Sequence, residues 1–207
     1  MNTRDLYNQR VGKYRSLQDR SAELSTERSG LEEQVGDLAE AFDVLEAAAD
    51  GIRDSISEQL TQLLTGAMKD VFGPETGCRL YYRQLPSHQY RPVFEAWDED
   101  GVAGDPTEVL GGSAVEVIAL GLRIYFLVRC GQSRILILDE PLRGIDSTNV
   151  HAVGQWLRQI CHELGIQLIM VSHIGEGIFE NVADKVFVVE KVDGVSSIQE
   201  ADHACSG

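Results

Sequence analysis

The sequence predicts an α/β domain with a parallel sheet, preceded by a long coiled-coil helix. The first sign is a proline-free N-terminal third, rich in Glu, Gln, Leu, Arg and Ala, with apolar residues at heptad spacing. The second is an alternation of apolar helices and short, continuously apolar strands that begins near Gly111. This alternation is typical of a parallel sheet that helices cover on both faces.

Composition indicates a soluble protein of one domain plus an appendage. The chain has 207 residues, 43% of them apolar, which is enough for a substantial core. A formal net charge of -15 argues against a chain that coats nucleic acid by itself, because Lys and Arg make the phosphate contacts. The polar N-terminus has no signal-like apolar segment, and no apolar run reaches membrane-spanning length. We therefore expect a cytoplasmic or nucleoid-associated protein with no membrane partner.

Residues 1–64 form the predicted coiled-coil helix. Alternating steps of four and three residues define an apolar seam at Leu31, Val35, Leu38, Phe42, Leu45, Ala49, Ile52, Ile56 and, after Gln59, Leu63. A single helix cannot bury such a seam, and no other heptad run of this length occurs in the sequence. The partner helix is expected from a second polypeptide or a second copy. The alternative is a helix that folds back on its own domain.

Residues 65–207 form the predicted globular part. Proline and glycine in "FGPETG" (72–77) break the helix, and a two-strand insertion follows at about 78–97. The segments expected next are an apolar helix at 115–128, a strand at 135–138, a helix at 147–163, and strands at 166–171 and 185–190. The four widely spaced cysteines contain no CxxC pair, which favours reduced structural thiols over a zinc site.

Polar dipeptides follow two of the predicted strands. Asp139 and Glu140 come directly after "ILIL", and Ser172 and His173 end the next strand. The carboxyl ends of parallel strands meet at one edge, where ligands bind. Asp139 is suited to hold Mg²⁺, and Glu140 to orient and deprotonate a water molecule. An imidazole at position 173 is suited to contact a developing phosphate charge, so the pattern predicts phosphoryl transfer to water.

These segments resemble the motifs of ATP-binding-cassette (ABC) ATPases. "ILILDEP" (135–141) is similar to the Walker B strand, "LRGID" (142–146) to the D-loop, and "IMVSH" (169–173) to the switch-histidine strand. "VLGGSAVEVIALGLR" (109–123) resembles the signature motif, which opens a helix from residue 111. The four motifs occur in the family's order over about 109–173. With a coiled-coil helix on the N-terminal side, the chain is most similar to the SMC, RecN and Rad-fifty-type ATPases of DNA maintenance.

The resemblance implies ATP and Mg²⁺ as cofactors, with ATP held between two heads that dimerise face to face. It gives Asp139 to the metal, makes Glu140 the general base, and makes His173 the sensor of the γ-phosphate. Three further residues would complete the nucleotide site of the opposite head: Gly111, Gly112 and Ser113. Asp146, the last residue of the D-loop, is a further candidate for nucleotide binding.

Two departures from the family pattern change this reading. No GxxxxGK[ST] Walker A sequence occurs in the chain, and Leu110 stands where the family has a serine before the glycine pair. Ser113, after the pair, is the candidate substitute for that hydroxyl. The chain then represents half of a split head, inactive alone, or a piece cut from a longer protein. A partner polypeptide would supply the Walker A lobe and the second coiled-coil helix.

In such an assembly the expected function is ATP hydrolysis in DNA repair, recombination or genome maintenance, with DNA bound through the complex and a nuclease as a further possible partner. The alternative is a non-catalytic, ABC-like tethering or regulatory module. That module would have an ABC-like fold without turnover, because the Walker A sequence is missing and the signature is altered. Separate alternatives hold for single residues: Asp139 and Glu140 as a helix-capping pair, His173 as a satisfied core histidine, and Asp146 as the cap of the next helix. A transporter-type cassette is disfavoured because the long coiled coil has no place there.

Overall fold

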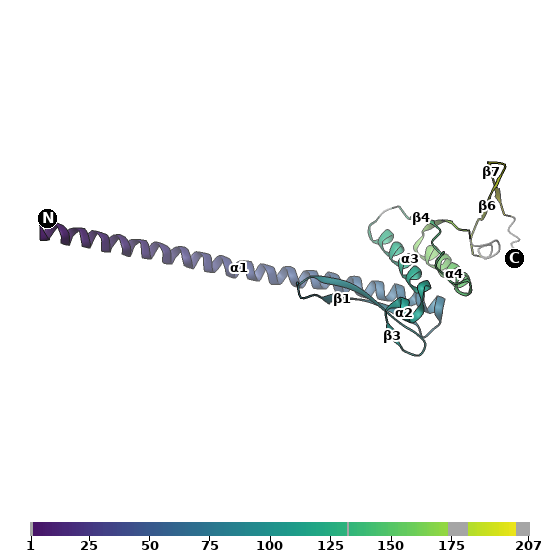
Figure 1. Ribbon diagram of the computed structural model, residues 1–207, viewed down its shortest axis with the longest axis horizontal. Coiled ribbons are helices and arrows are strands. Elements are labelled where there is room, and N and C mark those ends of the chain that lie inside the picture. Colours follow the sequence, from purple (N-terminus) through teal and green to yellow (C-terminus); the bar gives the residue numbers. More distant parts are fainter. Residues whose placement is uncertain (1, 132, 174–181, 202–207) are drawn as a thin grey trace. The chain divides into compact units, whose positions relative to one another are not determined.

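A computed structural model describes residues 2–131, 133–173 and 182–201 (Figure 1). The chain divides into two compact units, Met1–Arg53 and Asp54–Gly207, which we describe separately. Within the described ranges, no helix combines the length and apolar character needed to cross a bilayer. The elements are α1 (Thr3–Phe72), β1 (Gly77–Gln84), β2 (Tyr90–Trp97), β3 (Ala103–Gly104), α2 (Pro106–Leu110), α3 (Gly112–Arg129), β4 (Ile135–Asp139), α4 (Ser147–Leu164), β5 (Gln167–Val171), β6 (Phe187–Val192) and β7 (Val195–Glu200).

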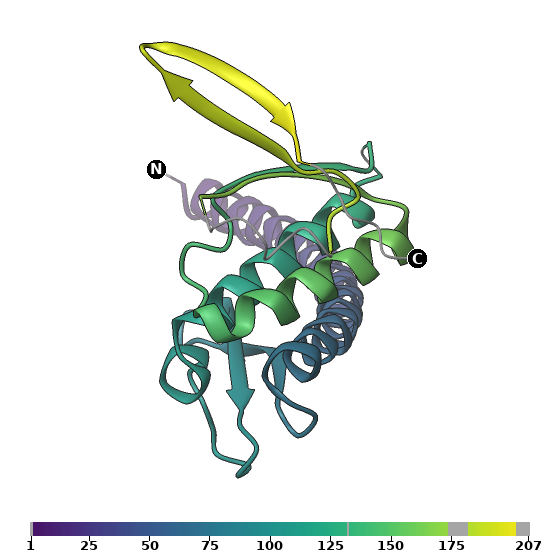
Figure 2. The same cartoon turned by 90° about the vertical axis from the view of Figure 1, so that its right-hand side faces the viewer.

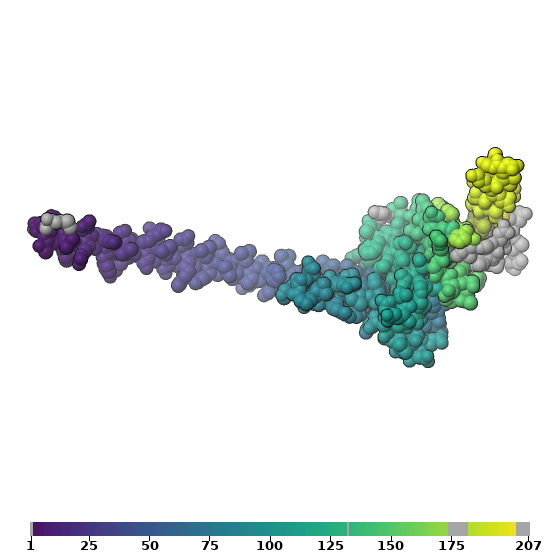
Figure 3. Space-filling model, viewed as in Figure 1, coloured from purple at the N-terminus to yellow at the C-terminus, as the bar shows by residue number. Residues whose placement is uncertain are grey.

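The first unit consists of the N-terminal part of α1 alone (purple in Figure 3). The apolar side chains of the predicted seam are exposed here, including Val35, Leu38, Phe42 and Leu45. An apolar stripe of this length is unfavourable in water unless another helix covers it. The unit therefore has the form of one strand of a coiled coil.

The second unit takes its core from the end of α1 together with α3 and α4. Leu64 and Met68 of α1 are fully buried in one cluster with Leu120 of α3 and Trp156 of α4. Helices α1 and α3 approach closely at Gly121, where an added Cβ would lie 2.7 Å from Cδ2 of Leu64. The core thus includes helical residues beyond 64. The compact unit starts at Asp54, before the domain boundary expected from the sequence, and the helix continues to Phe72.

Strands β1 and β2 are the two strands expected near 78–97, and they pair antiparallel as a hairpin. One face of this hairpin packs on α1. The Leu80 amide donates to Thr61 Oγ1 at 3.0 Å, and Thr65 Oγ1 donates to the Cys78 carbonyl at 2.8 Å. These bonds connect the hairpin to the buried end of the helix.

The parallel sheet consists of β4 and β5, with Ile135 opposite Gln167 and Asp139 opposite Val171. One face, with Leu138 and Met170, packs on the helical core (Figure 2). The other face is open, and Ile137 is 70% exposed there. The expectation of a sheet covered on both faces is therefore wrong for the described residues. Nothing in these ranges supplies a second layer.

The strand expected at 185–190 does not join this sheet. It corresponds to β6, which pairs antiparallel with β7 in a separate hairpin. Asp193 and Gly194, at the turn, have φ values of 51° and 82°. An Asp-Gly pair with both residues in the left-handed region is the preferred two-residue turn of a hairpin, so local turn chemistry decides the pairing. The prediction of a third parallel strand is wrong.

Candidate active site

The carboxyl ends of β4 and β5 bring two of the predicted catalytic residues together. The parallel pairing ends at Asp139 and Val171, and the Glu140 amide extends it by donating to the Val171 carbonyl at 2.8 Å. Glu140 has a φ of 48°, in a region that residues other than glycine seldom occupy. This turn directs the chain away from the sheet directly after the acidic pair.

Glu140 and His173 are direct neighbours at this edge. Nδ1 of His173 contacts Oε2 of Glu140, and the His173 amide donates to the same oxygen at 3.4 Å. The side chain of His173 is 67% exposed and that of Glu140 32% exposed, so both remain open to a ligand or water. No other described residue is recorded as bonding to the second carboxylate oxygen of Glu140. The pair can thus orient an imidazole through one oxygen while the other oxygen accepts a hydrogen bond from water.

Asp139 precedes this pair and is exposed. Its carboxylate forms no recorded hydrogen bond or ion pair with another described residue. The described ranges contain no group of three or more metal-ligating side chains. Mg²⁺ is commonly bound through one or two carboxylates together with substrate phosphates and water. A single free carboxylate therefore fits a Mg²⁺ that binds together with a nucleotide.

The predicted signature glycines form the turn into α3. Gly111, with φ 80° and ψ -176°, ends α2 and is the N-cap of α3. Apart from the adjacent residues and the helix's own backbone, a Cβ added at Gly111 or Gly112 would have no atom within 4 Å, so no other segment packs against these two positions. The first amide groups of a helix favour an anionic ligand. The turn has the geometry for such a contact.

Ser113 lies one residue further and is only 1% exposed. Its Oγ accepts from the Asp146 amide at 3.0 Å and donates to Asp146 Oδ2 at 3.1 Å. In this structure the hydroxyl therefore bonds to the chain's own D-loop. The assignment of Ser113 as a phosphate contact remains a prediction. The two bonds to Asp146 favour a role in positioning the 142–146 loop.

The predicted D-loop, 142–146, is held by packing as well as by Ser113. Leu142 is fully buried and Ile145 is 7% exposed. A Cβ at Gly144 would lie 3.0 Å from Cγ of Glu116 in α3, so this loop runs close to the signature helix. Asp146 is the N-cap residue of α4. Sequence reasoning did not identify the contribution of Glu116 or the bond between Ser113 and Asp146, because no local pattern links residues so far apart in the chain.

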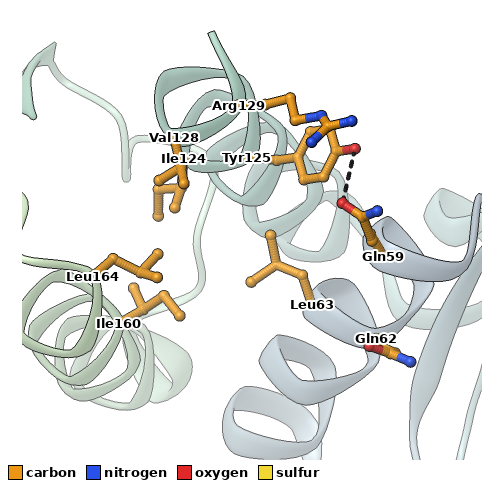
Figure 4. Close-up of a pocket in the computed structure, with 9 residues that line it drawn as sticks. All are labelled: Gln59, Gln62, Leu63, Ile124, Tyr125, Val128, Arg129, Ile160 and Leu164. Atoms are coloured by element: carbon orange, nitrogen blue, oxygen red, sulfur yellow. Dashed lines mark hydrogen bonds between the residues drawn. The ribbon is translucent and has the colours of Figure 1, made fainter. Parts of the chain in front are cut away.

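A groove lies elsewhere in the second unit, between α1, α3 and α4 (Figure 4). Its volume is about 470 Å³, and Leu63, Ile124 and Ile160 point into it. The Tyr125 hydroxyl donates to Gln59 Oε1 at 3.4 Å at its edge. None of the predicted site residues lines this groove. Its apolar lining distinguishes it from the polar edge at Asp139 and His173.

A parallel strand pair with Asp-Glu and Ser-His at its carboxyl edge, a glycine turn into a helix and a long preceding helix give this chain a fold similar to that of SMC head domains. Two solved structures of Smc head domains have a similar fold. The Smc head domain with a coiled coil and joint from Pyrococcus yayanosii matches with a TM-score of 0.65 and 20% identity over 93% of this chain and 36% of that chain. The Smc head domain from Pyrococcus furiosus, with an extended coiled coil and bound to the C-terminal domain of ScpA, has a TM-score of 0.63 and 20% identity over 95% of this chain and 48% of that chain.

Sequence comparison finds ATP-binding proteins of importers. The sulfate/thiosulfate import ATP-binding protein CysA of Bradyrhizobium diazoefficiens is 33% identical over 87 residues, which are 42% of this chain and 23% of that protein. The phosphonates import ATP-binding protein PhnC 3 of Nostoc sp. is 45% identical over 42 residues, which are 20% of this chain and 16% of that protein. The match thus spans about a quarter or less of these relatives. No family model matches the sequence.

Proposed function

We propose that this chain is the C-terminal lobe of an SMC-like ATPase head, which hydrolyses ATP when a lobe with a Walker A motif completes the site. The observation that carries the proposal is the contact between Glu140 and His173 next to the free carboxylate of Asp139. A general base, an imidazole that the base holds toward the phosphate, and a metal ligand at one strand edge are groups that suit phosphoryl transfer to water.

The open face of the β4–β5 sheet supports the second part of this proposal. Ile135, Ile137, Ile169 and Val171 are all exposed on that face. Apolar strand residues normally face a second layer. The sequence also lacks the phosphate-binding loop of this fold. One additional lobe, from a partner polypeptide or from another part of a longer protein, would supply both the layer and the loop.

Each site residue then has a defined task. Glu140 orients the attacking water and accepts its proton, while His173, held by Glu140, faces the phosphate. Mg²⁺ bound with ATP would neutralise phosphate charge, with Asp139 as the protein ligand. Gly111, Gly112 and the N-terminus of α3 would face the phosphates bound to the opposite head of an ATP-dependent dimer. Ser113 and Asp146 hold the D-loop against α3 beside this contact.

The long helix α1 favours an SMC-like protein over a transporter cassette. The sequence relatives are import proteins by name, but the match with the Pyrococcus Smc heads includes a coiled coil. We therefore place the complete assembly in DNA repair, recombination or genome maintenance. DNA would bind through the complex, the exposed seam of α1 would pair with a second helix, and a nuclease is a possible additional partner.

The test is to purify the chain with its bound partners from its native host and to measure ATP hydrolysis by the complex. Glu140→Gln removes the base and keeps the size of the side chain, so turnover should be lost while the ATP-bound dimer becomes more stable. Glu190→Gln, an exposed change in β6, is the matched control and should retain turnover. Unchanged turnover in Glu140→Gln would refute the assignment of Glu140.

The exposed seam of α1 also fits a second function, a tether without turnover. The two functions differ in nucleotide affinity. Both predict weak ATP binding by the isolated chain, but only the ATPase predicts tight binding once the Walker A lobe is added. A homodimer without turnover or nucleotide binding would establish the tether.

A further inference from the structure

The solvent face of the β1–β2 hairpin has a charge opposite to that of the chain. Side chains alternate between the faces of a strand, so Arg79, Tyr81 and Arg83 share one face of β1. The pairing register places Arg91 of β2 directly across from Arg83. The opposite face, with Leu80, is the one that packs on α1. We call Arg79, Tyr81, Arg83 and Arg91 the arginine face.

Tyr81 organises two of these arginines. The guanidinium carbon of Arg79 lies 5.8 Å from the centroid of the Tyr81 ring, within the range of a cation–π contact. Nη2 of Arg83 donates to the Tyr81 hydroxyl at 3.1 Å. Arg79 also pairs with Glu95 across the hairpin. The aromatic ring thus holds two long side chains in defined positions, which lowers the entropy cost of binding a ligand.

Arg83 and Arg91 have no carboxylate partner recorded among the described residues. Two like charges directly opposite each other destabilise a strand pair. The full sequence has 33 acidic residues against 18 Lys and Arg, so acidic partners are abundant elsewhere in the chain. Two adjacent guanidinium groups that lack such a partner therefore indicate a site for an external anion.

We propose that the arginine face binds the phosphate backbone of DNA. The arginines follow the strand: Arg79 and Arg83 are separated by about 13 Å at the usual rise per residue, which suits a row of phosphates better than one small ion. This inference deepens the proposed function, because it gives a DNA-associated ATPase a contact on this acidic chain.

The test measures binding of the full chain to a short fluorescein-labelled DNA duplex by anisotropy, without ATP, between about 50 and 200 mM salt. Each phosphate contact contributes about 0.9 to the slope of log affinity against log salt, so Arg83→Ala/Arg91→Ala should lower the slope by about 2 and weaken binding. The matched control is Arg10→Ala/Arg15→Ala, with the same charge change at exposed positions of α1, and should keep the wild-type slope. Arg83→Lys/Arg91→Lys keeps both positive charges, so this variant should also keep the wild-type salt slope.

Four results would overturn the proposal: no DNA binding by the wild type at low salt, the same loss of slope in both alanine variants, or equal competition at matched ionic strength by polyglutamate or by inorganic phosphate. Competition by polyglutamate would indicate an acidic protein partner, and competition by inorganic phosphate would indicate a free-phosphate site. Thermal unfolding should show that Arg83→Ala/Arg91→Ala remains folded, since it removes a repulsion. Glu140→Gln should bind DNA like the wild type, so failure here and failure of the ATPase proposal are distinguishable.

Discussion

Replacing Ser113 by alanine removes the hydroxyl that joins the start of α3 to the D-loop. The wild-type Oγ is buried and bonds to both the amide and the carboxylate of Asp146, at 3.0 and 3.1 Å. A neutral hydrogen bond contributes about 0.5–1.5 kcal/mol to stability, and a bond to a charged group about 1.5–3 kcal/mol. Asp146 is exposed, so water replaces part of both bonds after the substitution. We therefore expect a loss of about 1–2 kcal/mol in the free energy of unfolding.

Urea unfolding of the full chain measures this loss as a lower midpoint at an unchanged slope. Ser147→Ala is the control, because Ser147 is exposed beside Asp146 and has no recorded side-chain bond; its effect should stay within about 0.5 kcal/mol. Amide hydrogen exchange in residues 142–149 should also become faster in Ser113→Ala, because this segment would open locally more readily without the hydroxyl. Equal midpoints for the two variants, with unchanged exchange, would show that the hydroxyl does not hold the D-loop.

Three further predictions concern the core and the cysteines. Gly121→Ala places a Cβ 2.7 Å from Leu64 and should lower the free energy of unfolding by about 1–3 kcal/mol in urea; an unchanged midpoint would contradict this helix contact. Burial raises the pKa of the Cys78 thiol from 9.0 to about 12. Between these values the unfolded chain holds fewer protons than the folded one, so stability should fall as pH rises, by up to about 1.4 kcal/mol per pH unit. Burial also raises the pKa of the Cys161 thiol. In the native protein, thiol reagents should therefore modify the exposed Cys130 and spare Cys78 and Cys161; equal modification of all three would refute this prediction. Cys205 lies outside the described residues.

The sequence was sufficient to locate the helices and strands around the site. The apolar runs before Asp139 and Ser172 are short and bounded by polar residues, and the structure has strands there. Parallel strands end at a common edge, so the adjacency of Glu140 and His173 followed from two local patterns and one rule of topology. The predicted roles of these residues in catalysis remain to be measured.

Other features depend on contacts that local patterns do not encode. The burial of Ser113 against Asp146 joins residues in separate motifs, and a lone serine after two glycines has no periodicity that would reveal it. The third strand was assigned to the parallel sheet from its apolar character alone, although the Asp193-Gly194 turn favours a hairpin. Coverage of both sheet faces was expected because continuous apolar strands usually have it. Here the layer on one side is absent from the described residues.

The open sheet face connects assembly with catalysis. Two strands are too few to form a stable sheet unaided, so β4 and β5 depend on helices for support. Leu138 and Met170 pack on the helical core from one face of the sheet. Ile137 and Ile169, on the other face, are exposed. Glu140 and His173 continue directly from these half-covered strands. Under the proposed function, the lobe that delivers the Walker A loop would also cover the open face, so the same event would bring the nucleotide and fix the positions of Glu140 and His173 more closely.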